Sequence, residues 1–397
     1  MAEARSRHAW AEVDLDAIGH NAAALVAVAA PAGLCAVVKA DGYGHGAVPV
    51  ARAALEAGAS WLAVAVVEEG EVLRRSGIDV PVLLLAEPPV EAMAAAVAHG
   101  LTLTLYTLPG VEAAARAVPR GRAPTPVHVK VDTGMHRVGA APEDVVDVAR
   151  AVDEAHGLRL EGLWTHLAVA EEPTEEAYTV EQLRRFEAVR DRLAAVGIHP
   201  PLLHTANSAG AVAHEAARYD LVRCGISLYG YSPDPALAAR LDLRPAMSLR
   251  ARVSFVKELE AGERVSYGLR YEVPRRSDVA TVPLGYDDGV RRRLGLLGCE
   301  VLIRGRRCPM AGTVTMDQFL VDCGPASGVV PGDEVVLIGR QGDQEITADG
   351  WAELLDTISY EIVCGVGPRV PRVYRGGGGE TGQRIEQPIL AAGGPEV

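Results

Sequence analysis

Hydrophobic and polar positions alternate in two different ways along the chain, and the change falls near residue 230. Between residues 33 and 229, short runs rich in β-branched residues are each followed by a segment of helical period. Eight strands are predicted, at residues 34–39, 61–67, 80–86, 101–106, 127–132, 160–166, 202–206 and 221–226. Eight strands with intervening helices predict a (β/α)8 TIM-type barrel. An open doubly wound sheet remains the competing arrangement, because a strand count cannot prove closure.

The last third of the chain has a different pattern. From residue 247 to 374 helical periodicity nearly disappears, except at 348–357, and strand-like runs such as 248–256 alternate with Gly, Pro and Asp turns. This pattern predicts a mainly antiparallel β domain. We therefore divide the chain into a barrel at 1–240, a β domain at 241–375 and a disordered tail at 376–397. A short strand at 10–15 could pack on either domain.

The composition fits a globular protein of two domains and excludes several classes. The 397 residues are 49% hydrophobic and 23% charged, with a net charge of −13. This charge argues against nucleic acid or an anionic membrane as a partner, and no run reaches the roughly 18 apolar residues that span a bilayer. The six cysteines form no C-x-x-C pair, so we expect no metal site. Acidic residues at 12, 14 and 16 precede the apolar stretch 22–30, which argues against a signal peptide and for a cytoplasmic protein.

Lysine is rare, which narrows any amine chemistry to three residues. Lys39 and Lys130 lie at the ends of predicted barrel strands, whereas Lys257 is expected at the surface of the β domain. Catalytic groups of such barrels gather at the carboxyl ends of the strands, and a buried ammonium must be paired, neutralised or used. A paired core lysine is the alternative for Lys39, and simple pairing with Asp132 is the alternative for Lys130.

The loops after the seventh and eighth strands of such barrels often bind phosphate. Ser208 starts a predicted helix, whose backbone N–H groups favour an anion, and Gly225 permits close approach of a ligand. Asn207 and Ser208 could equally well act as ordinary helix caps. A phosphate site beside an inward lysine suggests pyridoxal phosphate (PLP), whose aldehyde forms a Schiff base with an amine.

Eight short motifs resemble those of the alanine racemases, in order and in both domains. In the barrel they are VVKADGYGHG at 37–46, KVDTGMHRVG at 130–139, HTANSAG at 204–210 and RCGISLYG at 223–230. In the β domain they are VSYG at 265–268, GYDDG at 285–289, TMDQ at 315–318 and SYEI at 359–362. The resemblance implies a PLP-dependent isomerase that interconverts L- and D-alanine and supplies D-alanine for peptidoglycan precursors.

The resemblance also implies roles for the matching barrel residues. Lys39 would hold PLP as a Schiff base and serve as the base for D-alanine. The phosphate would be bound by Tyr43, Ser208, Gly225, Ile226 and Tyr360. Arg223 would face the pyridine nitrogen, and Arg137 would bind the phenolic oxygen and the substrate carboxylate. Lys130 is often carbamylated in this family, which would orient Arg137, and Asn207 would support the site. Because arginine stays charged, Arg223 would disfavour ring protonation and so limit transamination.

In the β domain, Tyr267 would be the second base, acting on L-alanine, and His166 would link it to Arg223. Tyr267, Tyr286 and Met316 would reach the site from a partner subunit, with the Met316 N–H binding the carboxylate, so the active enzyme would be a homodimer. Arg292 and Asp317 would have supporting roles.

Two residues depart from the family's pattern, and other functions remain open. Glu171 stands where Asp is common and Thr313 where Arg is common, along the substrate entrance of relatives, which leaves substrate breadth in doubt. A racemase of this family acting on serine or a broader range of substrates is the first alternative. A related PLP-dependent decarboxylase and a single-barrel PLP-carrying protein are the others.

Overall fold

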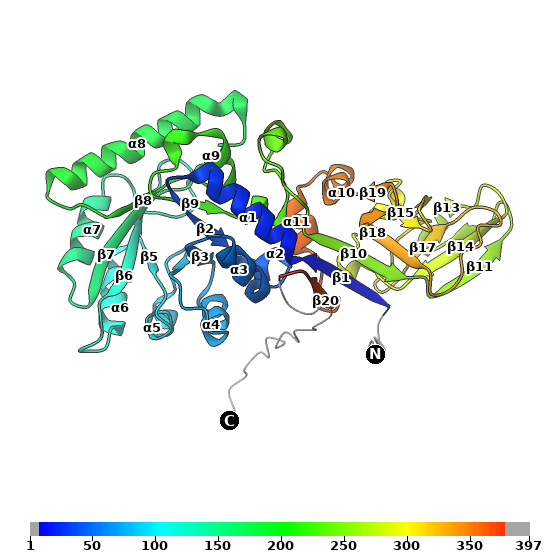
Figure 1. Ribbon diagram of the computed structural model, residues 1–397, viewed down its shortest axis with the longest axis horizontal. Coiled ribbons are helices and arrows are strands. Elements are labelled where there is room, and N and C mark those ends of the chain that lie inside the picture. Colours follow the sequence, from blue (N-terminus) through cyan, green and yellow to red (C-terminus); the bar gives the residue numbers. More distant parts are fainter. Residues whose placement is uncertain (1–7, 378–397) are drawn as a thin grey trace. The chain divides into compact units, whose positions relative to one another are not determined.

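The computed structural model describes residues 8–377, and the chain divides into two compact units, each described here by itself (Figure 1). The barrel unit comprises Asp16–Ala246 and Asp356–Gly365. The β unit comprises the chain up to Leu15, Met247–Leu355 and the chain from Val366 onward. The tail predicted at 376–397 falls almost wholly outside the described residues. In the described part of the chain, no helix is long and apolar enough to cross a membrane.

The barrel unit has eight parallel strands that close on themselves. They are β2 (Gly33–Val37), β3 (Trp61–Val64), β4 (Val82–Leu84), β5 (Leu103–Leu105), β6 (Thr125–Lys130), β7 (Leu158–Trp164), β8 (Leu202–His204) and β9 (Leu221–Cys224). Each pairs with the next along β2–β4 and β5–β8, and β9 pairs with β2. A parallel bridge from Leu83 to Thr102 joins β4 to β5. On the other side Arg223 N donates to Ala206 O at 3.0 Å and joins β9 to β8. The predicted barrel is confirmed, and the open sheet is excluded.

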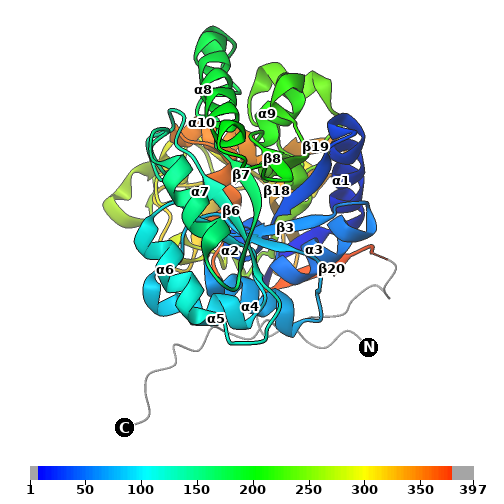
Figure 2. The same ribbon diagram turned by 90° about the vertical axis from the view of Figure 1, so that its left-hand side faces the viewer.

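Helices surround the strands of the barrel (Figure 2). They are α1 (Leu15–Ala29), α3 (Ala47–Glu56), α4 (Val67–Arg75), α5 (Met93–Ala98), α6 (Leu108–Ala117), α7 (Val145–Glu154), α8 (Glu176–Ala195) and α9 (Ser208–Ala213). In α7 the buried residues Val145, Val148, Ala149 and Val152 follow the i, i+3, i+4, i+7 spacing of one helical face. This apolar face is what covers the barrel, and the polar remainder faces outward.

The two units are not continuous in sequence, which differs from the single boundary expected near residue 240. Helix α11 (Ser359–Cys364) follows most of the β unit along the chain but belongs to the barrel unit. Its Val363 carbonyl lies so close to Gly44 that a Cβ there would come within 2.7 Å of the oxygen. A six-residue helix has too little pattern to show which core it packs on, so the sequence could not reveal this return.

The β unit contains mainly antiparallel sheets. The largest runs in the order β16 (Arg306–Pro309), β15 (Glu300–Ile303), β18 (Glu334–Gln341), β10 (Met247–Arg252), β1 (Ala9–Asp14) and β20 (Arg372–Arg375), with β19 (Gln344–Ile346) beside β18. A second sheet consists of β11 (Phe255–Leu259), β14 (Ser277–Val282) and β17 (Phe319–Asp322), and β12 (Arg264–Val265) pairs with β13 (Tyr271–Glu272). One helix, α10 (Ala348–Leu355), matches the helical segment expected there. The N-terminal strand β1 pairs with β10 and β20, so it belongs to this unit.

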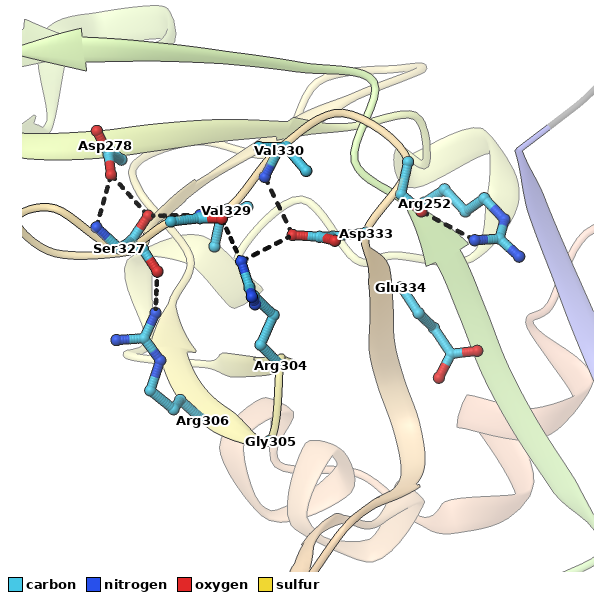
Figure 3. A network of polar contacts seen from close by, with 12 residues as sticks. Arg252, Asp278, Arg304, Gly305, Arg306, Ser327, Val329, Val330, Asp333 and Glu334 are labelled. Carbon is cyan, nitrogen blue, oxygen red and sulfur yellow. Dashed lines mark hydrogen bonds and ion pairs between the residues drawn. The ribbon is translucent and has the colours of Figure 1, made fainter.

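A network of polar contacts fixes the loop between β17 and β18 (Figure 3). Asp278 Oδ2 accepts hydrogen bonds from the Ser327 amide and hydroxyl, both at 2.7 Å. Arg306 donates to the Ser327 carbonyl at 3.0 Å, and the Val330 amide donates to Asp333 at 3.0 Å. None of the predicted site residues belongs to this network, so we assign it a structural role.

Candidate active site

Lys39 lies just after β2, where the chain enters a strained turn. The short helix α2 (Lys39–Tyr43) has left-handed backbone angles, with φ of 52° at Ala40, 50° at Asp41 and 51° at Tyr43. Such angles are uncommon for residues other than glycine, and they concentrate at functional sites. Glu69 fixes the start of the turn, because its Oε1 accepts from the Ala40 amide at 2.6 Å. The turn therefore holds the amine at the carboxyl end of its strand.

Positive charge accumulates at this end of the barrel. Burial, followed by the charge of Arg137, lowers the pKa of the Lys39 amine. Lys130 is buried, and burial, followed by the charges of Arg223 and Arg137, lowers its pKa to about 7 despite the opposing effect of Asp132. The Lys130 amine lies 4.1 Å from the centre of the Trp164 ring. This surplus of cationic groups favours binding of an anion.

Arg223 on β9 is buried among carbonyls and imidazoles. Its Nη2 donates to Thr165 O at 2.8 Å, and its Nη1 lies 2.8 Å from His204 Nδ1. His166 Nδ1 lies 3.3 Å from Nη2 and must accept, because a guanidinium has no acceptor. Burial and the charge of Arg223 hold the pKa of His166 well below its usual value. His166 is therefore neutral, and its proton is on Nε2.

Aromatic rings and small residues form a cradle beside these groups. The Tyr43 ring stacks on Tyr229, with centroids 4.7 Å apart, and lies 6.2 Å from Tyr360. A Cβ on Gly225 would come within 2.3 Å of the Tyr43 hydroxyl oxygen, so only glycine fits there. Ser208 Oγ accepts from the Gly225 amide at 3.0 Å. The cradle thus brings hydroxyls and a backbone turn together, as a phosphate requires.

The barrel unit also contains Asn207, Ile226 and Glu171. Asn207 caps α9 in the ordinary way, since its Oδ1 accepts from the Gly210 amide at 2.8 Å. Ile226 is buried directly after Gly225. Burial, and then the charge of Glu171, raises the pKa of Tyr360. The departure at Glu171 thus places a carboxylate near the cradle.

The β unit holds the second group of predicted residues. Tyr267 is 72% exposed and follows Ser266, whose φ is 62°. The hydroxyl of Thr313 donates to the Tyr267 carbonyl at 3.0 Å, and the hydroxyl of Ser266 donates to the Thr313 carbonyl at 2.6 Å. Thr313 is buried, and its neutral side chain adds no charge where the family commonly has an arginine. Its side chain instead fixes the turn that carries Tyr267.

Tyr286 and Met316 lie on two loops of the β unit that are joined through their backbones. The Tyr286 amide donates to Thr315 O at 3.0 Å, and the Asp287 amide donates to Met316 O at 3.2 Å. Arg369 binds both loops, with 2.7 Å contacts to Asp287 and Asp317. The side chains of Met316, Tyr286 and Arg292 are exposed.

The predicted residues therefore form two groups, one in each unit. The barrel group contains Lys39, Tyr43, Lys130, Arg137, His166, Asn207, Ser208, Arg223, Gly225, Ile226 and Tyr360, and the β-unit group contains Tyr267, Tyr286, Arg292, Met316 and Asp317. Sequence reasoning gave no role to several residues that contact these groups or lie one contact further away: Glu69, His128, Trp164, His204, Tyr229 and Arg369. His128 had a signal, because the alternation at 127–132 predicts that it faces the barrel interior. His204 and Tyr229 lie in the motifs at 204–210 and 223–230, which were another signal.

A closed β/α barrel that carries a half-buried lysine and an anion cradle at the carboxyl ends of its strands, followed by a β unit, is typical of a class of enzymes that hold PLP on a lysine. Comparison with known proteins narrows this class. Residues 13–233 match the family model of the alanine racemase N-terminal domain, and residues 246–374 match that of the C-terminal domain. The chain belongs to the alanine racemase family.

Individual relatives agree with this assignment. The alanine racemase of Symbiobacterium thermophilum is 50% identical over 375 residues, which cover 94% of this chain and 98% of that protein. The alanine racemase of Thermobifida fusca is 45% identical over 374 residues, which cover 94% and 99%. Among solved structures, the Bacillus anthracis alanine racemase with bound L-Ala-P has a TM-score of 0.88 at 38% identity and covers 95% of this chain and 97% of that one.

The barrel group fits the PLP on which this family depends. A dianionic phosphate would relieve the surplus of cations around Lys39 and Lys130. The narrow approach over Gly225 suits a backbone contact with phosphate oxygens. Arg223 makes its hydrogen bonds within the described residues to carbonyls and imidazoles, which leaves its charge available to a ligand.

Proposed function

We propose that this protein interconverts L- and D-alanine, with Lys39 as the residue that holds PLP. The observation that carries the proposal is the strained turn after β2, which begins at the half-buried Lys39 and ends at Tyr43, a member of the cradle with Ser208 and Gly225. Membership of the alanine racemase family supports the same substrate and reaction. The product would serve the synthesis of peptidoglycan precursors in the cytoplasm.

Inversion of the α-carbon requires one base on each face of the substrate. When bound, PLP supplies the electron sink that makes removal of the α-proton feasible. Lys39 Nζ exchanges the proton of D-alanine, and its lowered pKa favours the neutral amine that can accept a proton. Tyr267 Oη exchanges the proton of L-alanine. Arg223 is assigned to the pyridine nitrogen, where a group that only donates disfavours protonation.

The remaining residues bind and orient. Arg137 and the Met316 amide are assigned to the substrate carboxylate, and the cradle of Tyr43, Ser208, Gly225, Ile226 and Tyr360 to the phosphate. His166 is assigned to the link between Tyr267 and Arg223, and its neutral ring suits it to donate from Nε2. Tyr286, Arg292, Asn207 and Asp317 support these groups.

Lys130 is proposed to carry a carbamate. A pKa of about 7 leaves a large share of the amine neutral near pH 7. The neutral nitrogen adds to carbon dioxide, a new N–C bond forms, and one proton is released. The resulting anion offsets the neighbouring charges of Arg137 and Arg223. Intact-mass measurement in bicarbonate buffer should show a gain of one carbon dioxide per chain, and Lys130→Arg should abolish this gain.

The active form is proposed to be a homodimer in which Tyr267, Tyr286 and Met316 complete the partner's site. Tyr267 is largely exposed in the single chain, and a phenol that acts as a base needs a site shielded from water. Mixing inactive Lys39→Ala and Tyr267→Phe chains tests this. Random pairing into two-fold dimers would restore about a quarter of the wild-type activity. If both residues came from one chain, the mixture would stay inactive.

Racemisation itself is tested with purified, PLP-loaded protein. Circular dichroism should follow loss of optical activity from L-alanine, and Lys39→Ala should abolish it. Lys257→Ala is the matched control, because Lys257 is an exposed lysine of the β unit. Equal turnover of Lys39→Ala and Lys257→Ala would overturn the proposal. Serine and lysine as substrates would separate an alanine racemase from one with a broader range, which Glu171 and Thr313 leave open.

A further inference from the structure

A line of polar side chains leads from Arg223 into the interior of the barrel and ends on Glu161. Arg223 Nη1 lies 2.8 Å from His204 Nδ1, and His204 Nε2 lies 2.8 Å from His128 Nδ1. His128 Nε2 lies 3.3 Å from Glu161 Oε2, a longer contact than the other two. In the described part of the chain, Nε2 has no partner with hydrogen-bond geometry, so its contact with Glu161 is an ion-pair contact. Both imidazoles are fully buried, and the Glu161 side chain is 15% exposed.

The chemistry of the two ends fixes which atom carries the proton in every contact of this line. A guanidinium can only donate, so His204 Nδ1 must accept and its proton is on Nε2. That proton is donated to His128 Nδ1, which must also accept, so the second proton is on His128 Nε2. An ionised carboxylate can only accept, which is what His128 Nε2–H requires. One arrangement of protons therefore suits all three contacts. Without an acceptor at Glu161, this arrangement would leave the buried His128 Nε2–H with no carboxylate to face, so Glu161 removes the cost of the arrangement that Arg223 requires.

The charge states agree with this arrangement. Burial holds the pKa of His204 well below its usual value, and the charge of Arg223 adds to the effect. Burial also lowers the pKa of His128, although Glu161 opposes it. Burial works against ionisation of Glu161, but hydrogen bonds from His128 and Arg159 outweigh it and lower its pKa. Both rings are neutral, and the carboxylate is charged.

The local sequence builds the contact between His128 and Glu161. Val127 pairs with Leu160 but His128 pairs with Gly162, so Glu161 is the extra residue of a β-bulge in β7. A bulge of this kind turns a side chain away from its regular direction. A Cβ on Gly162 would come within 2.7 Å of the His128 ring, so glycine is needed at that position. The bulge and the glycine together allow the imidazole and the carboxylate to meet.

We propose that Glu161 is a positioning residue for the reaction, which fixes the proton positions of His128 and His204 and thereby holds Arg223 in place. The proposal rests on the proposed function, in which Arg223 faces the reactive ring. Without an acceptor at residue 161, the proton of His128 can move from Nε2 to Nδ1. The proton of His204 would then have to move from Nε2 to Nδ1 as well. His204 Nδ1 would present a proton to Arg223, and two donors would face each other.

The first test observes the protons directly and does not depend on activity. NMR of isotope-labelled histidines in the apoprotein, assigned by substituting each ring, should show His128 and His204 neutral with the proton on Nε2. Glu161→Ala should move at least one proton to Nδ1. Glu161→Gln should retain the wild-type pattern, because its amide oxygen can still accept. A charged ring or an Nδ1 proton in the wild type, or an unchanged pattern in Glu161→Ala, would overturn the proposal.

The second test uses kinetics, with Arg159→Gln as the matched control. Arg159 lies 2.8 Å from Glu161 on its exposed side, so its loss leaves the line of hydrogen bonds intact. Loss of a hydrogen bond to a charged group predicts a fall in kcat/KM of at least about tenfold for Glu161→Ala. Glu161→Gln should recover most of this, and Arg159→Gln should match the wild type. The rate at which bound PLP is lost to transamination should rise in the order Arg159→Gln, Glu161→Gln, Glu161→Ala.

The outcomes separate this proposal from the function on which it rests. If Glu161→Ala yields no folded protein, Glu161→Gln and Arg159→Gln still test the proposal. Only Glu161→Gln replaces the charged acceptor that faces His128 by a neutral one. Reversed protons with unchanged racemisation and transamination would refute a positioning role. Absence of racemase activity in the wild type, with the predicted histidine protons present, would refute the proposed function instead.

Discussion

Thr313→Val removes the hydroxyl that holds the turn carrying Tyr267 and keeps the shape of the side chain. Thr313 is buried, and its hydroxyl donates to the Tyr267 carbonyl at 3.0 Å. A hydrogen bond of this kind contributes about 1 kcal/mol net. The turn would therefore leave its position about fivefold more often. We expect kcat/KM to fall by up to about fivefold, since only the turn that carries the phenol is affected.

The effect should be unequal for the two proton transfers. If Tyr267 serves L-alanine, its step becomes slower, and the isotope effect with C2-deuterated L-alanine should grow while that with D-alanine shrinks. The overall kcat/KM stays equal for the two enantiomers, because their equilibrium constant is one. Thr313→Ser should restore the wild-type values. Thr347→Val is the matched control, since the Thr347 hydroxyl accepts from the Gly350 amide at the start of α10 and not in the loops assigned to the site. Wild-type isotope effects in Thr313→Val would refute the reasoning.

Three more outcomes follow from the geometry of the site. Gly225→Ala should weaken PLP binding to the apoprotein by at least about fivefold, because the new Cβ would come within 2.3 Å of the Tyr43 hydroxyl and overpacking costs about 1–3 kcal/mol. Fluorescence titration measures the affinity for PLP, and Gly19→Ala, which places its Cβ in open space, should bind PLP normally. Arg369→Ala should raise KM for alanine more than it lowers kcat, because Arg369 joins the loops of Tyr286 and Met316 through Asp287 and Asp317. Steady-state kinetics would contradict this expectation if only kcat changed. Arg340→Ala is the control, because it removes a comparable exposed ion pair. Apoprotein freed of carbon dioxide should gain stability, relative to Lys130→Met, as the pH rises from 7 to 9. The pKa of Lys130 is about 7 in the folded state against an ordinary value of 10.5, so the unfolded chain binds more protons in this range. A fall in the Tm relative to Lys130→Met with rising pH would show that burial does not destabilise the charged amine.

The barrel strands could be predicted because each is a short run of apolar, often β-branched residues between helical segments. Their ends could not be predicted as well. The strand expected at 61–67 ends at Val64, and α4 begins at Val67. Valine suits the end of a strand and is tolerated at the first position of a helix, so its presence does not mark the boundary.

The β unit shows how a continuous pattern can hide a change of sheet. Residues 248–256 alternate as one strand would, but β10 ends at Arg252 and β11 begins at Phe255 in another sheet. At the break, both the amide and the hydroxyl of Ser254 donate to the Thr281 carbonyl. The alternation of side chains is the same on either side, so the period contains no information about the partner strand.

The net charge of the chain gave little guidance about the charge of its ligand. With a net charge of −13, the protein as a whole repels anions. At one end of the barrel, however, four cationic residues lie close together: the charge of Arg137 lowers the pKa of Lys39, and the charges of Arg223 and Arg137 lower the pKa of Lys130. Screening by salt limits the effect of distant charges beyond about 8 Å, whereas buried groups are screened much less. Local charge, rather than the sum over the sequence, therefore favours an anionic ligand at this end of the barrel.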